Sequence, residues 1–304
     1  MLRLALLGGL HITQDAVALA GFVSRKAQAL LAYLAVTGRP HHRAALAGLL
    51  WGDLPEARAA GNLRVVLANL HDLLPHHLDI ARTEVAFDRS SDHWLDVAEF
   101  ERACQAGQAQ APGGGPPAQL AHAAGLYCGD FLEGFYVHDA PAFEEWTLIE
   151  RERLRQMQLQ ALHALTRSYS ARGEYAAAIE AAGRLLALDP WREEAHRELM
   201  RLLALSGQRS AALAQYEQCR RLLRDELGLE PLEETTALYE RLVHWETGNL
   251  VDWETGNLVN WETGRSGDRA TNLPIYQSTN LPIYQFTNLP FTGRGAEHAA
   301  LLTW

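Results

Sequence analysis

The stretch from Arg43 to Leu74 constrains the fold of this chain more than any other. Apolar residues recur in it at the three- and four-residue spacing of one helical face, first over Arg43–Trp51 and then again up to Leu74. The Gly-Asp-Leu-Pro segment between them interrupts the pattern, because proline ends one helix and is tolerated only in the first turn of the next. The second helix begins at either Glu56 or Gly61. The sequence therefore predicts two amphipathic helices joined by a turn, which is a helix-turn-helix.

Short strands are predicted on both sides of this motif. Leu2–Leu7 and Ala16–Leu19 are apolar runs separated by a turn-rich spacer, and we expect them to pair with each other. A helix follows Ser24, a residue type that caps helix N-termini well. After the motif, Leu78–Arg82 and Glu84–Phe87 alternate apolar and polar residues like the two arms of a hairpin. Strands, three helices and a hairpin are the order of a winged helix, whose third helix enters the major groove of DNA.

The second half of the chain contains an internal repeat within about Pro141–Leu242. The segment Gly-Glu-Tyr-Ala-Ala-Ala-Ile from Gly173 recurs as Gly-Gln-Arg-Ser-Ala-Ala-Leu from Gly207, an offset of 34 residues. That offset is the period of the tetratricopeptide helical hairpin. Glycine at the turn and small alanines at the helix crossing let the two helices of such a hairpin approach closely. The repeat therefore predicts stacked helical hairpins.

Residues 245–291 differ in kind from the rest. The octapeptide Trp-Glu-Thr-Gly-Asn-Leu-Val-Asp starts at Trp245 and recurs, and Thr-Asn-Leu-Pro-Ile-Tyr-Gln-Ser starts at Thr271 and recurs. An eight-residue period with Pro or Gly in each unit matches no packed repeat. We interpret 245–291 as a disordered low-complexity linker, with an aromatic-rich recognition peptide as the alternative. Residues 108–117, which are rich in Gly and Pro, are expected to be a flexible surface connection.

Composition favours a protein of about two domains. The chain has 304 residues and a net charge of −10, which excludes a generic polyanion binder, so any nucleic-acid contact needs a local basic patch. Residues 1–77 offer one, with seven Arg and Lys against four Asp and Glu. The sequence has no run of apolar residues long enough to span a membrane, and its three cysteines fit neither a disulfide framework nor a zinc site. We therefore expect a cytoplasmic protein with free thiols that does not enter membranes.

The sequence offers no catalytic or metal-binding constellation. It lacks the HExxH motif of metalloproteases and the GxSxG motif of hydrolases. The adjacent histidine pairs His41-His42 and His76-His77 cannot share one helical face. A phosphate-binding GxxxxGK[ST] loop is also missing. We therefore expect no enzymatic activity, no cofactor and no metal.

In its order of elements the chain resembles the SARP/AfsR-type bacterial transcriptional activators. Those proteins join an OmpR/PhoB-type winged helix to a bacterial transcriptional activation domain of tetratricopeptide-like helices. The resemblance rests on short motifs that are spread over residues 1–244: Phe22–Ala35, Leu49–Asp53, Ala57-Arg58, Asn62–Arg64, Asp96–Phe100, Tyr127–Leu132, Glu144–Trp146, Asp189-Pro190, Glu194–Arg197, Met200, Glu226–Pro231 and Leu238-Tyr239. It implies a mainly α fold with a small β component, with a winged helix at 1–94, a helical-repeat activation domain at 95–244 and a low-complexity tail.

Residues 292–304 resemble the lead-in to an ATPase domain that larger family members carry, except that Gly295 stands where Glu is usual. No phosphate loop follows, so we expect no ATP hydrolysis by this chain. The segment is interpreted as a remnant of such a domain start. The chain is then either a truncated large member or a small member with a relic tail.

Helical projection divides the predicted third helix into two faces. Leu63, Val66, Leu67, Leu70 and Leu74 form the expected buried stripe. On other faces, Arg64 can donate two hydrogen bonds to guanine or phosphate, and Asn62 or Asn69 can pair with adenine. The full set of candidate DNA-binding residues adds His71 and the cations near helix starts and the hairpin: Arg64, Asn62, Asn69, His71, Arg58, Arg43, Arg25, Lys26 and Arg82.

The resemblance and these residues together predict a sequence-specific transcription regulator, an activator that reads promoter repeats in double-stranded DNA. Its helical-repeat domain would contact a protein, with RNA polymerase or a second copy of the chain as candidates, as a homodimer or in tandem on DNA. An alternative is a helical-repeat interaction module whose winged helix has lost strong DNA binding. Ala68, Asn69, His71 and Asp72 motivate this alternative, because they offer little positive charge.

Overall fold

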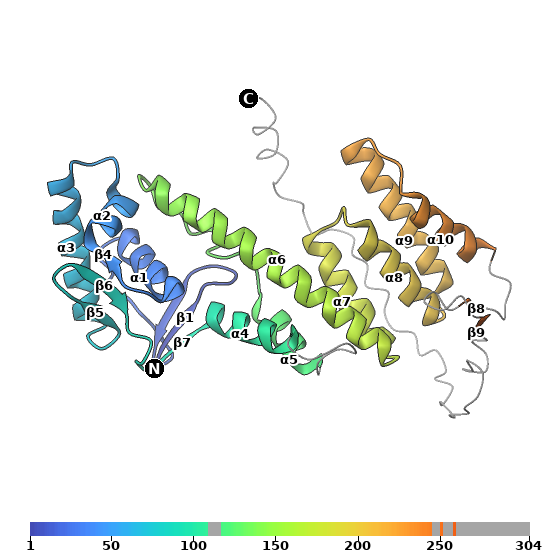
Figure 1. Ribbon diagram of the computed structural model, residues 1–304, viewed down its shortest axis with the longest axis horizontal. Helices are drawn as coiled ribbons and strands as arrows, with labels where there is room; N and C mark the ends of the chain where they lie inside the picture. Colours follow the sequence, from blue (N-terminus) through green and yellow to red (C-terminus); the bar gives the residue numbers. More distant parts are fainter. Residues whose placement is uncertain (109–116, 245–249, 252–257, 260–304) are drawn as a thin grey trace. The chain divides into compact units, whose positions relative to one another are not determined.

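The computed structural model of the protein describes residues 1–108, 117–244, 250–251 and 258–259 (Figure 1). The described residues up to 244 belong to one compact unit. The connection predicted within 108–117 and the tail predicted at 245–304 fall almost entirely outside the described residues. Within that tail, strands β8 (Leu250–Val251) and β9 (Leu258–Val259) pair antiparallel.

The N-terminal part is a winged helix. Its elements alternate short strands with three helices: β1 (Leu2–Ala5), β2 (His11–Gln14), β3 (Val17–Ala18), α1 (Arg25–Thr37), β4 (His41–His42), α2 (Arg43–Trp51), α3 (Glu56–Leu73), β5 (Leu78–Ile80), β6 (Glu84–Phe87) and β7 (His93–Leu95). The first sheet has the strand order β3-β2-β1-β7, and the second has the order β4-β6-β5. Strands β5 and β6 form the predicted hairpin, which is the wing.

The N-terminal strands pair differently from the prediction. β1 pairs antiparallel with β2, which comes from the supposed spacer, and β3 pairs with β2 instead of β1. Ile12 in β2 is 7% exposed, so this strand also contributes a buried side chain to the core. β7 pairs parallel with β1 and was not predicted, because its partner lies some 90 residues away in sequence.

The helices of the winged helix follow their local signals. Ser24 caps α1 by accepting a hydrogen bond from the N–H of Ala27, and Gly38, with φ +59°, ends it. Helix α3 begins at Glu56 and runs without a break through Gly61, which settles the two alternatives for its start. The helix-turn-helix is therefore present with α2 and α3 in the predicted places.

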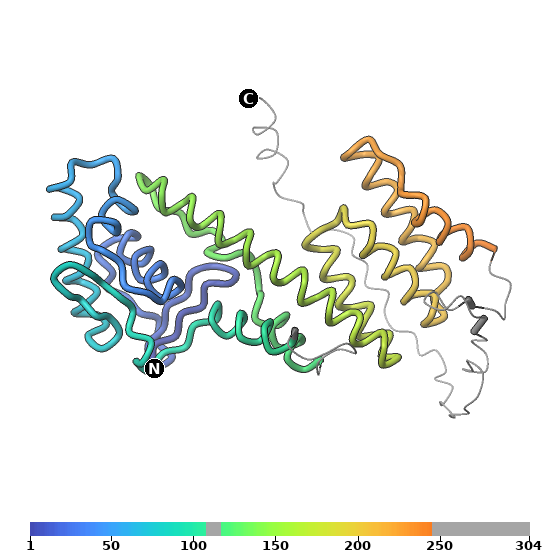
Figure 2. The backbone as a smooth tube through the Cα atoms, viewed as in Figure 1, coloured from blue at the N-terminus to red at the C-terminus, as the bar shows by residue number. Residues whose placement is uncertain are grey.

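The C-terminal part is a stack of helices (Figure 2). Its elements are α4 (Asp96–Gln108), α5 (Pro117–Leu126), α6 (Pro141–Ala171), α7 (Tyr175–Leu188), α8 (Glu193–Leu205), α9 (Arg209–Leu222) with a π-helical turn at Leu223–Leu227, and α10 (Glu233–Val243). Successive helices from α6 to α10 pack against each other. None of the described helices combines the length and hydropathy needed to cross a membrane.

The 34-residue repeat recurs in the hydrogen bonds of the backbone. The N–H of Gly173 donates to Ser170 and that of Gly207 donates to Ala204, the equivalent residue one period later. Both glycines have left-handed φ angles, +72° and +79°, which a side chain would strain. Ala178 and its equivalent Ala212 are fully buried. The prediction of repeated helical hairpins is confirmed.

The two parts share one hydrophobic core, which extends from β1 into α7 and α8. The carboxylate of Asp96, the first residue of α4, accepts hydrogen bonds from the N–H groups of Leu6 and Leu7, at 2.6 and 2.8 Å. Burial raises the pKa of this carboxyl group, although its backbone donors act in the opposite direction. Beyond β1, Gly8 donates to the carbonyl of Asp130, so the winged helix and the helical domain are joined through backbone contacts.

The cysteines are free thiols, as predicted. Cys104 and Cys219 are buried, and burial raises the pKa of each thiol to about 12. Such thiols are protonated at neutral pH and unreactive. They serve as small apolar side chains in the core.

Candidate nucleic-acid interface

Helix α3 buries the predicted stripe and exposes the opposite face. All five apolar residues of the stripe are at most 3% exposed: Leu63, Val66, Leu67, Leu70 and Leu74. Arg64, Val65 and Ala68 lie in solvent, with Val65 58% exposed. The face that the projection selected is therefore accessible.

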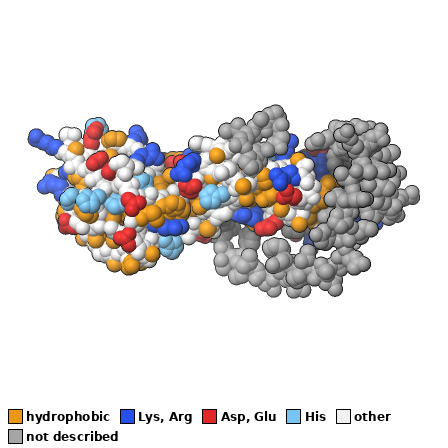
Figure 3. Space-filling view, turned by 90° about the horizontal axis from the view of Figure 1, so that it is seen from below, with side chains coloured by type: hydrophobic (Ala, Val, Ile, Leu, Met, Phe, Trp, Pro, Cys, Tyr) orange, Lys and Arg blue, Asp and Glu red, His pale blue; other side chains and the backbone are white. Residues whose placement is uncertain are grey.

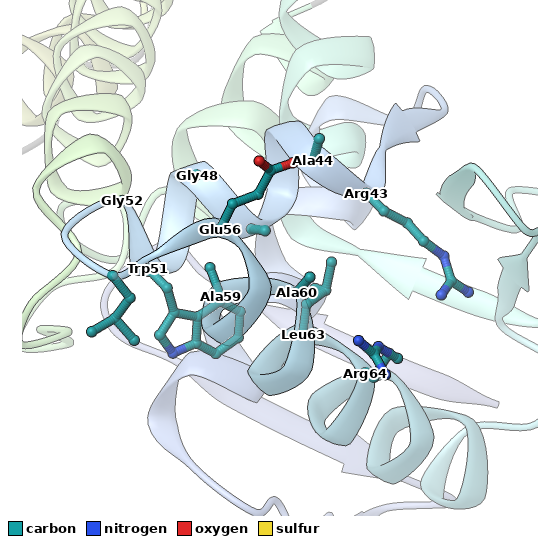
Figure 4. A pocket seen from close by; sticks show the side chains of 12 residues that line it. Arg43, Ala44, Gly48, Trp51, Gly52, Glu56, Ala59, Ala60, Leu63 and Arg64 are labelled. Carbon is teal, nitrogen blue, oxygen red and sulfur yellow. The ribbon is translucent and has the colours of Figure 1, made fainter.

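A cleft of about 410 Å³ separates α2 from α3 (Figure 4). Small side chains such as Ala47 and Ala59 line it, and Trp51 lies at one end. Arg43 from α2 and Arg64 from α3 lie at the opposite end of the cleft (Figure 4). The two helices thus present a pair of cations on one side of the helix-turn-helix.

Asn69 is already engaged within the protein. Its Oδ1 accepts a hydrogen bond from the N–H of Val23 at 2.9 Å, and its Nδ2 donates to the carbonyl of Gly21 at 3.0 Å. Asn69 follows Arg64 by five residues, which places it about 140° away around the helix. Its amide holds the loop before α1 against α3, whereas the sequence suggested an adenine contact.

Arg25 and Lys26 face the helical domain. Arg25 donates to the carbonyl of Tyr136 at 3.1 Å. Lys26 donates to the carbonyls of Leu50 and Asp139, at 2.6 and 2.9 Å, and burial lowers the pKa of its ammonium group. The prediction that these two cations clamp a phosphate did not anticipate these partners, two of which, Tyr136 and Asp139, lie more than 100 residues away in sequence. Both side chains join α1 to the segment before α6.

Arg43 contacts the wing. Its Nε donates to the carbonyl of Ala81 at 3.0 Å, and its backbone N–H donates to the carbonyl of Thr83 at 2.9 Å. Arg82, between them, is exposed at the tip of the β5–β6 hairpin, and Arg58 is exposed on the first turns of α3. His71 is exposed and Asn62 is half-buried. Among the candidates, Arg43 and Arg64 line the same cleft, and Arg43 also bonds to the two neighbours of Arg82.

The cations of the winged helix lack acidic partners. Residues 1–94 contain eight arginines and one lysine against eight acidic residues. Among the described residues, no carboxylate oxygen lies within 4.0 Å of any of these nine cationic side chains. On the face of the molecule in Figure 3, Lys and Arg side chains project from this end. The exposed members of this group that bear on α3 and the wing, Arg58, Arg64 and Arg82, are available to phosphates.

The arginines of the helical domain are arranged differently. Residues 95–244 contain fifteen arginines against twenty-three acidic residues. Nine of these arginines form ion pairs with carboxylates: Arg102, Arg153, Arg155, Arg172, Arg192, Arg197, Arg201, Arg220 and Arg224. This domain is acidic overall and its positive charge is largely neutralised. It is a poor surface for DNA.

Comparison with known proteins agrees with this architecture. Residues 95–243 match the family model of the bacterial transcriptional activator domain. The chain is 28% identical over 245 residues to the regulatory protein AfsR of Streptomyces coelicolor, and 27% identical over 249 residues to AfsR of Streptomyces griseus. Each match covers 80% of this chain but only 24% of the relative, so the chain spans about a quarter of their length.

The fold is also similar to a solved structure, that of Mycobacterium tuberculosis EmbR in complex with a low-affinity phosphopeptide. The TM-score is 0.60 at 25% sequence identity, over 80% of this chain and 65% of EmbR. The chain is thus a winged helix joined to a bacterial transcriptional activator domain. These similarities support a relationship to the SARP/AfsR-type bacterial transcriptional regulators.

Proposed function

We propose that this chain is a sequence-specific DNA-binding transcription regulator, and that it acts as an activator. The observation that carries the proposal is the set of cations on the winged helix that have no carboxylate partner among the described residues. Unpaired arginines beside an exposed helix supply the charge that binding to phosphates requires. Binding to DNA would require the protein to be in the cytoplasm, in agreement with its composition.

Base reading is assigned to α3. Arg64 is its one exposed central cation and can bond to both acceptors of guanine, while Val65 and Ala68 can contact thymine methyl groups. His71 adds a further donor. Asn69 is left out of this set because its amide already holds the loop before α1. Asp72 lies on the same exposed side and weakens binding by repelling phosphates.

The helical domain is assigned to protein contacts. Its acidic surface and paired arginines make a second protein a better partner than DNA. RNA polymerase is the partner expected of an activator, and promoter repeats would be read by two copies of the chain. The presence of only one arginine, Arg64, in the centre of α3 favours two copies, because one winged helix with so few contacts binds weakly.

The test is selection of bound sequences from a random DNA pool with the full chain, followed by a mobility-shift titration. We expect a defined motif, and Arg64→Ala should lower the affinity for it by about tenfold, with a loss of specificity at one base pair. Arg167→Ala is the matched control, since Arg167 is an exposed arginine of α6. Failure to enrich any sequence at low salt would overturn the proposal.

The second candidate function is a protein-interaction module without strong DNA binding. The observation in its favour is the low charge of the exposed α3 face, where Asp72 and Ala68 accompany a single arginine. It predicts equal, weak binding to all DNA sequences. The same selection experiment distinguishes the two candidates.

A further inference from the structure

The wing tip is attached to the start of α2 by a single residue. The two carbonyls that flank Arg82 in the chain, those of Ala81 and Thr83, both accept hydrogen bonds from Arg43. One bond comes from the Nε of its side chain at 3.0 Å and the other from its backbone N–H at 2.9 Å. Arg82 is thus held on both sides by its neighbours' carbonyls.

The geometry explains why the wing needs this support. Strands β5 and β6 pair only from Leu78 to Ile80 with Val85 to Phe87, and beyond them the N–H of Ala81 donates to Glu84. The carbonyl of Ala81 is bonded to Arg43 instead of to the opposite strand. β4 supports β6 at its other edge as far as the pair His42–Glu84, but neither ladder reaches the tip residues Arg82 and Thr83. The tip is ordered by a contact from outside the hairpin.

Helix α2 is a suitable anchor because it starts where the second sheet ends. His42 pairs with Glu84 in the β4–β6 ladder, and Arg43 is the first residue of α2. The first N–H groups of a helix have no partner inside the helix, so the N–H of Arg43 is available to the wing. The orientation of the hairpin is therefore fixed relative to α2 and α3.

From these contacts we infer that Arg43 is a positioning residue for the wing, and that Arg82 is the DNA-contacting residue that depends on it. The inference rests on the proposed DNA-binding function and refines it. Arg43 acts through the hydrogen bond that its Nε donates to the carbonyl of Ala81, whereas an arginine that binds a phosphate would act through its positive charge. Arg82 then enters the minor groove or meets the backbone beside the site that α3 reads.

Two substitutions separate the two roles of Arg43. In Arg43→Gln the amide nitrogen lies the same number of bonds from Cα as Nε, so the bond to Ala81 is kept and the charge is lost. In Arg43→Lys the charge is kept and that donor is lost. We expect Arg43→Gln to bind the selected duplex within about twofold of the native chain. Arg43→Lys and Arg43→Ala should each lose about tenfold, as should Arg82→Ala.

Coupling and salt dependence provide a second readout. Arg82→Ala should lower the salt slope of binding by about one unit, and adding Arg43→Ala to it should cost nothing more. His42→Ala, which changes the exposed residue directly before Arg43, is the control and should bind like the native chain. Native affinity for Arg43→Lys together with a loss in Arg43→Gln would overturn the inference and identify a phosphate contact.

Hydrogen exchange tests, in the absence of DNA, whether Arg43 holds the wing tip in place. Arg43→Ala and Arg43→Lys should speed exchange at the amides of the wing tip, while Arg43→Gln should leave it unchanged. Unchanged exchange in all three variants would overturn the inference. If the native chain binds no DNA but exchange follows the expected order, the proposed function fails while the attachment of the wing by Arg43 stands.

Discussion

The winged helix and the helical domain use arginine in opposite ways. In the helical domain most arginines are held by carboxylates, often three residues away on the same helix, as Arg153 is by Glu150. In the winged helix the cations bond to backbone carbonyls or project into solvent, as Arg43 and Arg64 do. Exposed ion pairs contribute little to stability, so the pairing in the helical domain acts mainly to neutralise its surface. The difference separates a surface available to phosphates from one that is not.

The two surfaces belong to parts that share one hydrophobic core, and the largest expected effect on stability comes from a change at the contact between these parts. Asp96→Ala leaves the N–H groups of Leu6 and Leu7 without their buried acceptor, and should lower the free energy of unfolding by about 3 kcal/mol or more. Denaturant titration should show both parts unfolding in one transition. Asp79→Ala removes an exposed carboxylate and is the control. Equal effects of the two substitutions would show that the Asp96 contacts do not hold the parts together.

The charge contrast itself is tested by removing one exposed arginine of the winged helix and one ion-paired arginine of the helical domain, and comparing the effects on DNA binding. Arg64→Ala should weaken specific DNA binding by about 1–3 kcal/mol, because it removes a base or phosphate contact. Arg153→Ala should leave DNA binding unchanged, since Arg153 already pairs with Glu101 and Glu150. Mobility-shift titrations at one salt concentration measure both. A larger loss from Arg153→Ala would invalidate the contrast between the two regions.

Asn69 and Arg64 provide a comparison within α3 itself, between a side chain bonded inside the protein and one exposed to solvent. Asn69→Ala removes two hydrogen bonds to the loop before α1, and should lower the free energy of unfolding by about 1–2 kcal/mol. Its effect on DNA affinity should be smaller than that of Arg64→Ala. For the stability measurement, Asn62→Ala, at a half-buried asparagine of the same helix, serves as the control. If Asn69→Ala kept its stability but lost a preference for adenine, Asn69 would be a base-contacting residue after all.

The smallest expected effect concerns pH. Burial lowers the pKa of His41, His77 and His196 below its ordinary value, so each is neutral in the folded protein. The unfolded chain takes up protons at these positions from about pH 6.5 downward, so the stability that the neutral forms contribute is lost as pH falls through that range. Thermal unfolding at pH 7.5 and 5.5 should show this loss. His196→Gln should reduce it, and an unchanged pH dependence would contradict the assignment.

Local signals predicted most of the helical fold. Ser24 and Gly38 set the ends of α1, and the 34-residue repeat identified the hairpin turns at Gly173 and Gly207. The strands were less predictable, because β1 pairs with β7 across the whole winged helix. Two or three residues of strand carry too little pattern to reveal a partner so distant in sequence.

The candidate site was predictable only where it depends on helix geometry. The spacing of apolar residues correctly predicted that Arg64 is exposed, because an amphipathic helix buries one face whatever it packs against. The partners of Arg25 and Lys26 could not be predicted, since Tyr136 and Asp139 approach them only in the folded chain. Asn69 was ambiguous for the same reason. Residue type suggested what each side chain can bond to, and the fold decided which bond it makes.

Lys26 has a practical consequence, because it is the only lysine in the sequence. Its amine lies at the junction of the two parts, bonded to the carbonyls of Leu50 and Asp139. An amine-specific reagent therefore finds one side chain to label, in addition to the N-terminal amine of Met1. The protein thus offers a single lysine through which a probe can be attached beside the junction of its two parts.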